Sequence, residues 1–186
     1  MTSDPISPQS GARPTHDSRL PTPETLDILI FTLGEQRYGL EMARVREIIR
    51  AVAVAPLPNS PESVMGVINL RGDLVPVFNL RGRFGLPLKQ LDPREHLVIA
   101  ESRCRLAALR VDRADGLASV PRPDISDART VVPGVELVTG AAKLPDGLVL
   151  IHDLDAFLSD AESTRLEAAM TDSRLSGMKS VGAVTL

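Results

Sequence analysis

The sequence predicts an all-β protein, built as a barrel or sandwich and arranged as two small barrels in tandem. Three observations support this prediction. Short apolar runs follow one another at close spacing, they are punctuated by many of the 15 prolines and 13 glycines, and almost no stretch has the pattern of a long amphipathic helix. The chain has 186 residues, which suits one compact domain or two small subdomains that share a core.

The first ordered element is expected to begin at Leu26. Residues 1–24 are rich in Pro, Ser and Thr and hold almost no apolar side chains, so we expect a disordered N-terminal arm. The apolar, β-branched run over 28–33 predicts a strand that ends at the glycine after it. A turn over 34–37 and extended structure over 38–40 would complete a hairpin.

Residues 45–49 leave two interpretations open. If the segment is a strand, Val45, Glu47 and Ile49 lie on one face of it. Alternatively, the segment is a helical turn that continues from Met42. The closely spaced prolines that come next forbid regular structure and predict a stiff connector.

Two further apolar runs, over 65–70 and 74–78, are separated by the triplet Arg71-Gly72-Asp73. This arrangement predicts two strands joined by a tight turn, in which Gly72 is the natural residue for a positive φ. Residues 79–84 are expected to leave the sheet as a short helical turn that ends near Gly85.

The second half of the chain predicts a second set of strands and a short helix. The strands are expected over 96–101, 105–111, 116–120, 136–141 and 148–151. The last two would form a hairpin around Pro145-Asp146-Gly147. A short helix is then expected over 153–158, with Leu154, Phe157 and Leu158 buried.

The C-terminal segment predicts one more helix. Ser159 and Glu162 have the spacing of a capping box, which indicates a short acidic helix from Ala161 to about Met170, before a tail to Leu186. We therefore expect three parts: a disordered arm over 1–24, a folded domain over 25–159, and a helix and tail over 160–186.

The sequence offers little chemistry for an enzyme. It holds one cysteine, Cys104, which excludes a disulfide framework and a multi-cysteine zinc site, and no two of its three histidines have the spacing of helical metal ligands. Phosphate-binding, dinucleotide-binding and nucleophile-elbow motifs are absent. We expect a protein that is not an enzyme, without cofactor or metal. The alternative is a cysteine hydrolase in which Arg103 and Arg105 lower the pKa of Cys104.

A second alternative is a small β-barrel nucleic-acid-binding protein, in which Arg71, Arg81 and Arg83 form a track for phosphates. The net charge of −3, the absence of Trp and the single Tyr argue against it, because such surfaces use basic charge and aromatic faces. Membrane insertion is not expected either, since no apolar run approaches the roughly 20 residues that cross a bilayer. No secretory signal is visible, so we expect a cytoplasmic location.

Arg71 is the best candidate for a contact with a partner on physical grounds. It lies beside a glycine at the junction of two expected strands, where a long planar donor can project from a rigid turn. The four residues Asn69-Leu70-Arg71-Gly72 recur ten positions later as Asn79-Leu80-Arg81-Gly82, but the flanks match only as apolar residues. We interpret this recurrence as coincidence.

Several separated motifs resemble the CheW-like domain of bacterial chemotaxis proteins, over about residues 26–159. They are Phe31-Thr32-Leu33-Gly34, Tyr38-Gly39-Leu40 and Val45-Arg46-Glu47-Ile48-Ile49; then Pro58-Asn59, Pro61, Gly66-Val67-Ile68-Asn69-Leu70-Arg71-Gly72 and Val75-Pro76-Val77; and last Leu109-Arg110-Val111-Asp112, Thr139-Gly140 and Leu148-Val149-Leu150-Ile151-His152-Asp153-Leu154. Their order and spacing agree together, which makes the resemblance specific.

The resemblance implies two small five-stranded β-barrels packed together, with no catalytic activity. It implies an adaptor or scaffold in chemotaxis signal transduction, located in the cytoplasm at membrane-associated receptor arrays. The implied partners are the regulatory domain of a CheA-type histidine kinase, the cytoplasmic tip of methyl-accepting chemoreceptors and, within arrays, other CheW-like domains. Carried over position by position, the receptor-binding residues are Val45, Glu47 and Arg71. The kinase interface is implied to be mainly apolar, and the resemblance assigns no residues to it.

One departure from the family pattern concerns residue 79. It is Asn here, where the family usually carries Asp, which removes a charge and is expected to alter a hydrogen bond in the turn.

Overall fold

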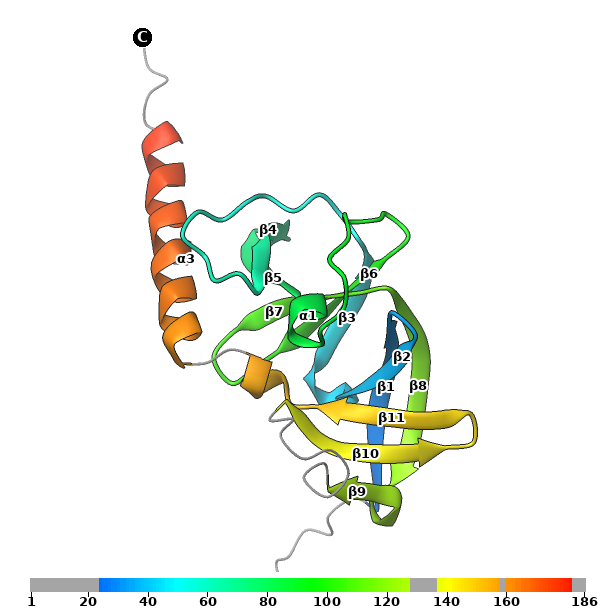
Figure 1. Ribbon diagram of the computed structural model, residues 1–186. Coiled ribbons are helices and arrows are strands. Elements are labelled where there is room, and N and C mark those ends of the chain that lie inside the picture. The colour runs from blue at the N-terminus through cyan, green and yellow to red at the C-terminus, as the bar shows by residue number, and fades with distance from the viewer. Residues whose placement is uncertain (1–23, 128–136, 158–159, 182–186) are drawn as a thin grey trace, which may run out of the picture.

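The protein consists of two β-sheet subdomains packed together, as the sequence predicts, with few short helices and one longer C-terminal helix (Figure 1). The computed structural model describes residues 24–127, 137–157 and 160–181. The strands are β1 (Thr25–Leu33), β2 (Gln36–Glu41), β3 (Val45–Arg50), β4 (Val64–Leu70), β5 (Asp73–Asn79), β6 (His96–Glu101), β7 (Leu106–Val111), β8 (Arg113–Pro121), β9 (Ile125–Asp127), β10 (Val138–Leu144) and β11 (Gly147–His152). The helices are α1 (Leu80–Arg83) and α3 (Asp160–Val181), and 3₁₀ turns cover Met42–Arg44, Arg122–Asp124 and Leu154–Phe157.

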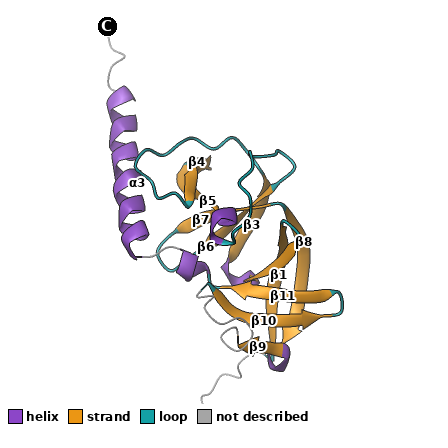
Figure 2. Ribbon diagram, in the orientation of Figure 1, coloured by secondary structure: helices purple, strands orange, loops and turns teal. Residues whose placement is uncertain are grey.

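The two sheets are not arranged in tandem along the chain. One sheet has the order β8-β1-β2-β11-β10-β9, and the other has the order β3-β6-β7-β5-β4. Strands β3 to β7 thus form the five-stranded sheet, while strands that come before and after them in the chain combine to form the six-stranded sheet (Figure 2). The expectation of tandem barrels was wrong because β2 finds its second neighbour not in β3 but in β11, to which it pairs in parallel.

The packing of the strands into three apolar cores explains why their sequences are continuous apolar runs. In β1, Ile28 and Ile30 pack in the core of the six-stranded subdomain, whereas Leu29, Phe31 and Leu33 pack in the core between the two subdomains. Successive side chains of a strand point to opposite faces, so a strand that is buried on both faces is apolar throughout. The core between the subdomains is the largest of the three and holds them together.

The five-stranded sheet follows the same rule. Leu97 and Ile99 of β6 pack in the core inside this subdomain, and Val98 and Ala100 pack toward the six-stranded one. Ala108 of β7 likewise lies in the inner core.

The connector between β3 and β4 closes one edge of the five-stranded sheet. Ala55 and Val67 exchange two backbone hydrogen bonds, of 2.9 and 2.8 Å. The approach is so close that a Cβ on Gly66 would lie 2.1 Å from the carbonyl oxygen of Ala55, so only glycine fits there. The expected stiff connector therefore also covers the free edge of β4.

Helices α1 and α3 lie outside the sheets. Asn79 caps α1, since its Oδ1 accepts a hydrogen bond from the backbone N–H of Arg81 at 3.2 Å. The Asn at this position therefore keeps a capping hydrogen bond. Helix α3 is longer than the helix expected from the capping box, and it buries Leu166 and Ala169 in the core between the subdomains. Its C-terminal end extends past the sheets in Figure 1.

Other differences from the expected elements are small. Strand β8 is longer than predicted. Strand β9 was not predicted, because three residues after a proline-rich break are too few to give a periodic signal. The short helix predicted over 153–158 is a 3₁₀ turn over Leu154–Phe157. Glu136, Leu158, Ser159 and residues 1–23 lie outside the described residues. In the described part of the chain, no helix is long and apolar enough to cross a membrane.

Candidate functional site

Strand β3 places two of the predicted receptor-binding residues, so of the two interpretations of residues 45–49 the strand is confirmed and the helical turn is wrong. A 3₁₀ turn over Met42–Arg44 leads directly into the strand. A β-bulge follows, because Val45 pairs with Ala100 while Glu47 pairs with Ile99. The prediction that Val45 shares one face with Glu47 and Ile49 was therefore wrong. Val45 packs against the core between the subdomains, while Ile49 packs against the inner core of its own subdomain.

Arg71 lies in the two-residue turn of the β-hairpin formed by β4 and β5. Leu70 pairs with Asp73, so Arg71 and Gly72 alone connect β4 to β5. Both have positive φ, +53° for Arg71 and +102° for Gly72, as a type I′ turn requires. The positive φ of Gly72 was predicted, whereas that of Arg71 was not. The turn is closed by Asn69, whose Oδ1 accepts a hydrogen bond from the Gly72 N–H at 2.8 Å.

Glu47 and Arg71 meet in an ion pair, although they are 24 positions apart. The Arg71 Nη2 donates to the Glu47 Oε2 at 3.0 Å. Strands β3 and β4 are the two opposite edges of the five-stranded sheet, so this contact shows that the sheet curls until its edges approach each other. The Arg71 side chain is 79% exposed and that of Glu47 is 28% exposed, which leaves most guanidinium donors free for a partner.

Of the three predicted receptor-binding residues, Glu47 and Arg71 contact each other, and Val45 does not share their surface. Glu47 and Arg71 form one polar surface feature, which we call the Glu47–Arg71 pair. Val45 lies two positions before Glu47 but is half-buried toward the other subdomain.

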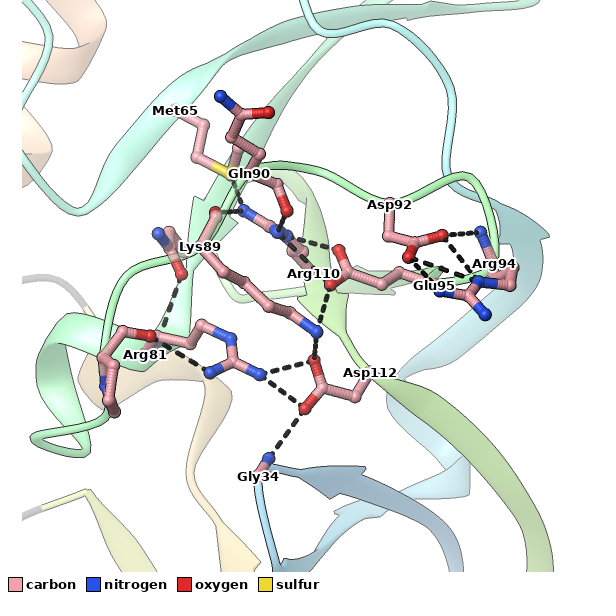
Figure 3. A network of polar contacts seen from close by, with 12 residues as sticks. Gly34, Met65, Arg81, Lys89, Gln90, Asp92, Arg94, Glu95, Arg110 and Asp112 are labelled. Atoms are coloured by element: carbon pink, nitrogen blue, oxygen red, sulfur yellow. Dashed lines mark hydrogen bonds and ion pairs between the residues drawn. The ribbon is translucent and has the colours of Figure 1, made fainter.

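A buried network of charges lies in the same subdomain (Figure 3). Its centre is Arg110 of β7, 2% exposed, which pairs with the equally buried Glu95 through two hydrogen bonds, from Nε at 2.6 Å and from Nη2 at 3.2 Å. The remaining guanidinium donors reach the carbonyl oxygens of Lys89 at 3.1 Å and Gln90 at 2.6 Å. These contacts satisfy a buried cation that would otherwise strongly destabilise the fold.

Asp112 forms the second half of this network. It accepts a hydrogen bond from the Gly34 N–H at 2.7 Å, pairs with Lys89 at 2.8 Å, and receives the Arg81 Nη2 on both carboxylate oxygens. Burial by itself would raise the pKa of Asp112, but the hydrogen bonds from Arg81, Lys89 and Gly34 outweigh it and lower this pKa to about 2. In Glu95 burial likewise acts against ionisation, and the hydrogen bonds from Arg110 and Lys89 lower the pKa.

This network fixes the long segment between α1 and β6 against β7, and Gly34 adds a link to the β1–β2 turn of the other subdomain. It was missed from the sequence, although a signal was present. Arg110 and Asp112 end an otherwise apolar strand run, where a charge has to find a partner.

The recurrence of Asn-Leu-Arg-Gly at 79–82 has a structural role that differs from the first copy. Arg81 is only 7% exposed and donates to Asp112 and, at 3.1 Å, to the carbonyl oxygen of Pro87. The phosphate track of the nucleic-acid alternative is therefore not present, since Arg81 is buried and Arg83 is paired with Glu162 of α3.

Cys104 is exposed at the tip of the β6–β7 hairpin, beside a cavity of about 210 Å³. Both arginines that were considered as activators are engaged elsewhere: Arg103 with Asp155, and Arg105 with Glu167 at 2.7 Å. Among the described histidines, His96 begins β6 at the end far from this tip, and His152 is buried against the rings of Tyr38 and Phe84. Neither of these two histidines thus lies beside Cys104, and the described residues contain no His, Cys, Asp and Glu group that could hold a metal ion.

Comparisons with known proteins agree with one another. A model of the CheW-like domain family matches residues 27–162. The chemotaxis protein CheW of Treponema pallidum is 27% identical over 160 residues, which cover 81% of this chain and 94% of that protein. The chemotaxis protein CheW of Klebsiella aerogenes is 30% identical over 138 residues, which cover 73% and 83%. The crystal structure of the scaffolding protein TtCheW from Thermoanaerobacter tengcongensis is similar with a TM-score of 0.65 and 30% identity, covering 70% of this chain and 90% of that one.

Proposed function

The chain belongs to the CheW-like domain family, and we propose that it is the non-enzymatic adaptor and scaffold that couples methyl-accepting chemoreceptors to a CheA-type histidine kinase. Its role in chemotaxis as a scaffold rests on the family match and on its likeness to relatives named as chemotaxis and scaffolding proteins. The identity of the two partners is the further step of the proposal. The protein works in the cytoplasm, at receptor arrays.

The observation that supports a receptor-binding surface is the Glu47–Arg71 pair. An arginine that is 79% exposed on a two-residue turn offers a rigidly placed set of donors. Glu47 occupies one of these donors and leaves the others directed at solvent. The receptor surface in this proposal consists of Glu47 and Arg71, with Val45 supporting β3 from within the fold.

The kinase-binding surface lies elsewhere in this proposal, as contact between related barrels. A protein that holds two partners in place needs modest affinity for each, because assembly in an array adds avidity. The experiment therefore has to measure binding to the receptor and binding to the kinase separately.

The test is a binding assay of the purified chain with a receptor cytoplasmic fragment, with the kinase, and with both together. We expect the protein to bind each partner and to make kinase activity respond to the receptor. Arg71→Glu should weaken receptor binding by about thirtyfold or more, which corresponds to the roughly 2 kcal/mol of an arginine hot spot. Binding of the kinase should not change.

Arg94→Glu is a matched control. Arg94 is 89% exposed and pairs with Asp92, 33% exposed, at 2.8 Å, so both variants reverse one exposed charge in a similar pair. An equal loss of receptor binding in both variants would show a general effect of charge and contradict the proposed surface. If the unmodified chain binds neither partner, the adaptor function itself is wrong.

A further inference from the structure

The turn at residues 70–73 carries an arginine in a backbone conformation that arginine rarely adopts. Arg71 has a φ of +53°, in the left-handed region where a Cβ crowds the following carbonyl oxygen. Asn, Asp or Gly would occupy this position of a type I′ turn with less strain. Something else in the structure must therefore hold Arg71 in this conformation.

Two contacts hold this turn, one on each side of Arg71. On the side of the backbone, Asn69 accepts the Gly72 N–H at 2.8 Å and closes the turn around Arg71. On the side of the guanidinium, Glu47 accepts from Nη2 at 3.0 Å. A Cβ on Gly72 would meet no atom within 4 Å, so glycine is needed there for its positive φ of +102° and not for lack of space.

The hydrogen bond to the Gly72 N–H is the contact that accounts for an asparagine at position 69. Asn69 is exposed, and its position in β4 lies opposite Leu74, where any polar side chain would serve. Aspartate and asparagine are the side chains whose oxygen readily reaches a backbone N–H a few residues further along the chain. The chemistry of Asn69 thus matches the one hydrogen bond that it accepts from the turn.

We propose that Asn69 is a positioning residue for receptor recognition, which presents Arg71 to the partner by locking the Arg71–Gly72 turn through the hydrogen bond to the Gly72 N–H. The inference rests on the proposed function, and it adds a residue that does not touch the partner. The partner supplies hydrogen-bond acceptors, carboxylate or carbonyl oxygens, to the guanidinium donors that Glu47 leaves unoccupied.

The second Asn-Leu-Arg-Gly copy provides a matched control. Asn79 also accepts a backbone N–H, that of Arg81 at 3.2 Å, but it caps α1 and its arginine is buried. Asn69→Ala and Asn79→Ala therefore delete the same kind of bond, one beside the proposed surface and one away from it. Asn69→Asp keeps an acceptor oxygen at the first position.

Receptor and kinase binding of these variants test the proposal, with Arg71→Glu as the reference. Asn69→Ala should weaken receptor binding about three- to tenfold, the effect of one hydrogen bond, and leave kinase binding unchanged. Asn69→Asp should restore receptor binding, and Asn79→Ala should retain it. Amide hydrogen exchange at Gly72 gives an independent readout: its protection should be lost in Asn69→Ala and kept in Asn69→Asp.

The outcomes separate the two proposals. If Arg71→Glu loses receptor binding while Asn69→Ala does not, the role of Asn69 is overturned and the receptor surface stands. Equal losses in Asn69→Ala and Asn79→Ala, or failure of Asn69→Asp to restore binding, also overturn the role of Asn69. If Arg71→Glu binds the receptor normally, the receptor surface itself is wrong.

Discussion

Replacing Glu95 by Gln should destabilise the protein far more than any change in its surface ion pairs. The substitution keeps the size of the side chain but removes its charge. The guanidinium of Arg110 is 2% exposed and would lose a charged partner at 2.6 Å, and Lys89 would lose its contact with Glu95 at 2.7 Å. The variant would leave a buried cation without its counter-charge, which destabilises the folded state.

The contacts of Arg110 and Lys89 determine how much unfolding free energy Glu95→Gln should lose. Removing one partner of a buried ion pair costs about 3–5 kcal/mol. Arg110 keeps two carbonyl acceptors, those of Lys89 and Gln90, and Lys89 keeps Asp112, so we expect the lower end, about 3 kcal/mol. This is a large share of the roughly 5–15 kcal/mol by which a domain is usually stable.

Urea denaturation of Glu95→Gln measures this loss, provided that the slope of unfolding free energy against urea is unchanged. Glu101→Gln is the matched control, because Glu101 pairs with Arg46 at 2.6 Å with side chains that are 55% and 61% exposed. The control should lose less than about 1 kcal/mol. If Glu95→Gln loses no more than Glu101→Gln, the reasoning that a buried charge fixes the segment between α1 and β6 is refuted.

Three more predictions concern other parts of the fold. Leu166→Ala should cost about 2–5 kcal/mol in urea denaturation, because Leu166 of α3 is fully buried; a loss below about 1 kcal/mol would mean that α3 is not part of the folded core. Burial lowers the pKa of His152 from 6.5 to about 4, so the unfolded chain takes up its proton first as the pH falls. The contribution of His152 to the free energy of unfolding should therefore decline by roughly 3 kcal/mol between about pH 6.5 and pH 4, and His152→Gln should remove this part of the decline; an unchanged pH dependence in His152→Gln would contradict it. Cys104→Ser should leave receptor and kinase binding unchanged and change stability by less than about 0.5 kcal/mol, since the thiol is exposed; a loss of function would revive a role for this cysteine.

The sequence was sufficient for most strands because buried strands leave a direct signal. The runs at 28–33, 96–101 and 148–151 are apolar on both faces, and the structure has strands there. What the sequence could not reveal was the neighbour of each strand. The parallel pairing of β2 with β11 joins residues 38 and 150, and nothing local to either segment encodes it.

The candidate site was predictable in part for a similar reason. A tight turn beside Gly72 follows from local chemistry, and so does an exposed arginine on it. The ion pair with Glu47 depends on how far the sheet curls, and the face of Val45 depends on one bulge in β3, which shifts the register without a sequence signal. Arg71 and Arg81 show the limit most clearly: they occupy identical tetrapeptides, yet one lies in a hairpin turn and the other in a helix.

The interleaved topology has a consequence for how a growing chain folds. Strands β3–β7 are contiguous from Val45 to Val111, so the sheet that carries Glu47 and Arg71 has all its strands once residue 111 has left the ribosome. The other sheet is completed only when β11 has been made, because β2 pairs with β11, more than 100 residues further along the chain. Until then the core around Val98 and Leu109 lacks Leu150 and Leu154, so a half-made chain exposes apolar surface there to aggregation or to a chaperone.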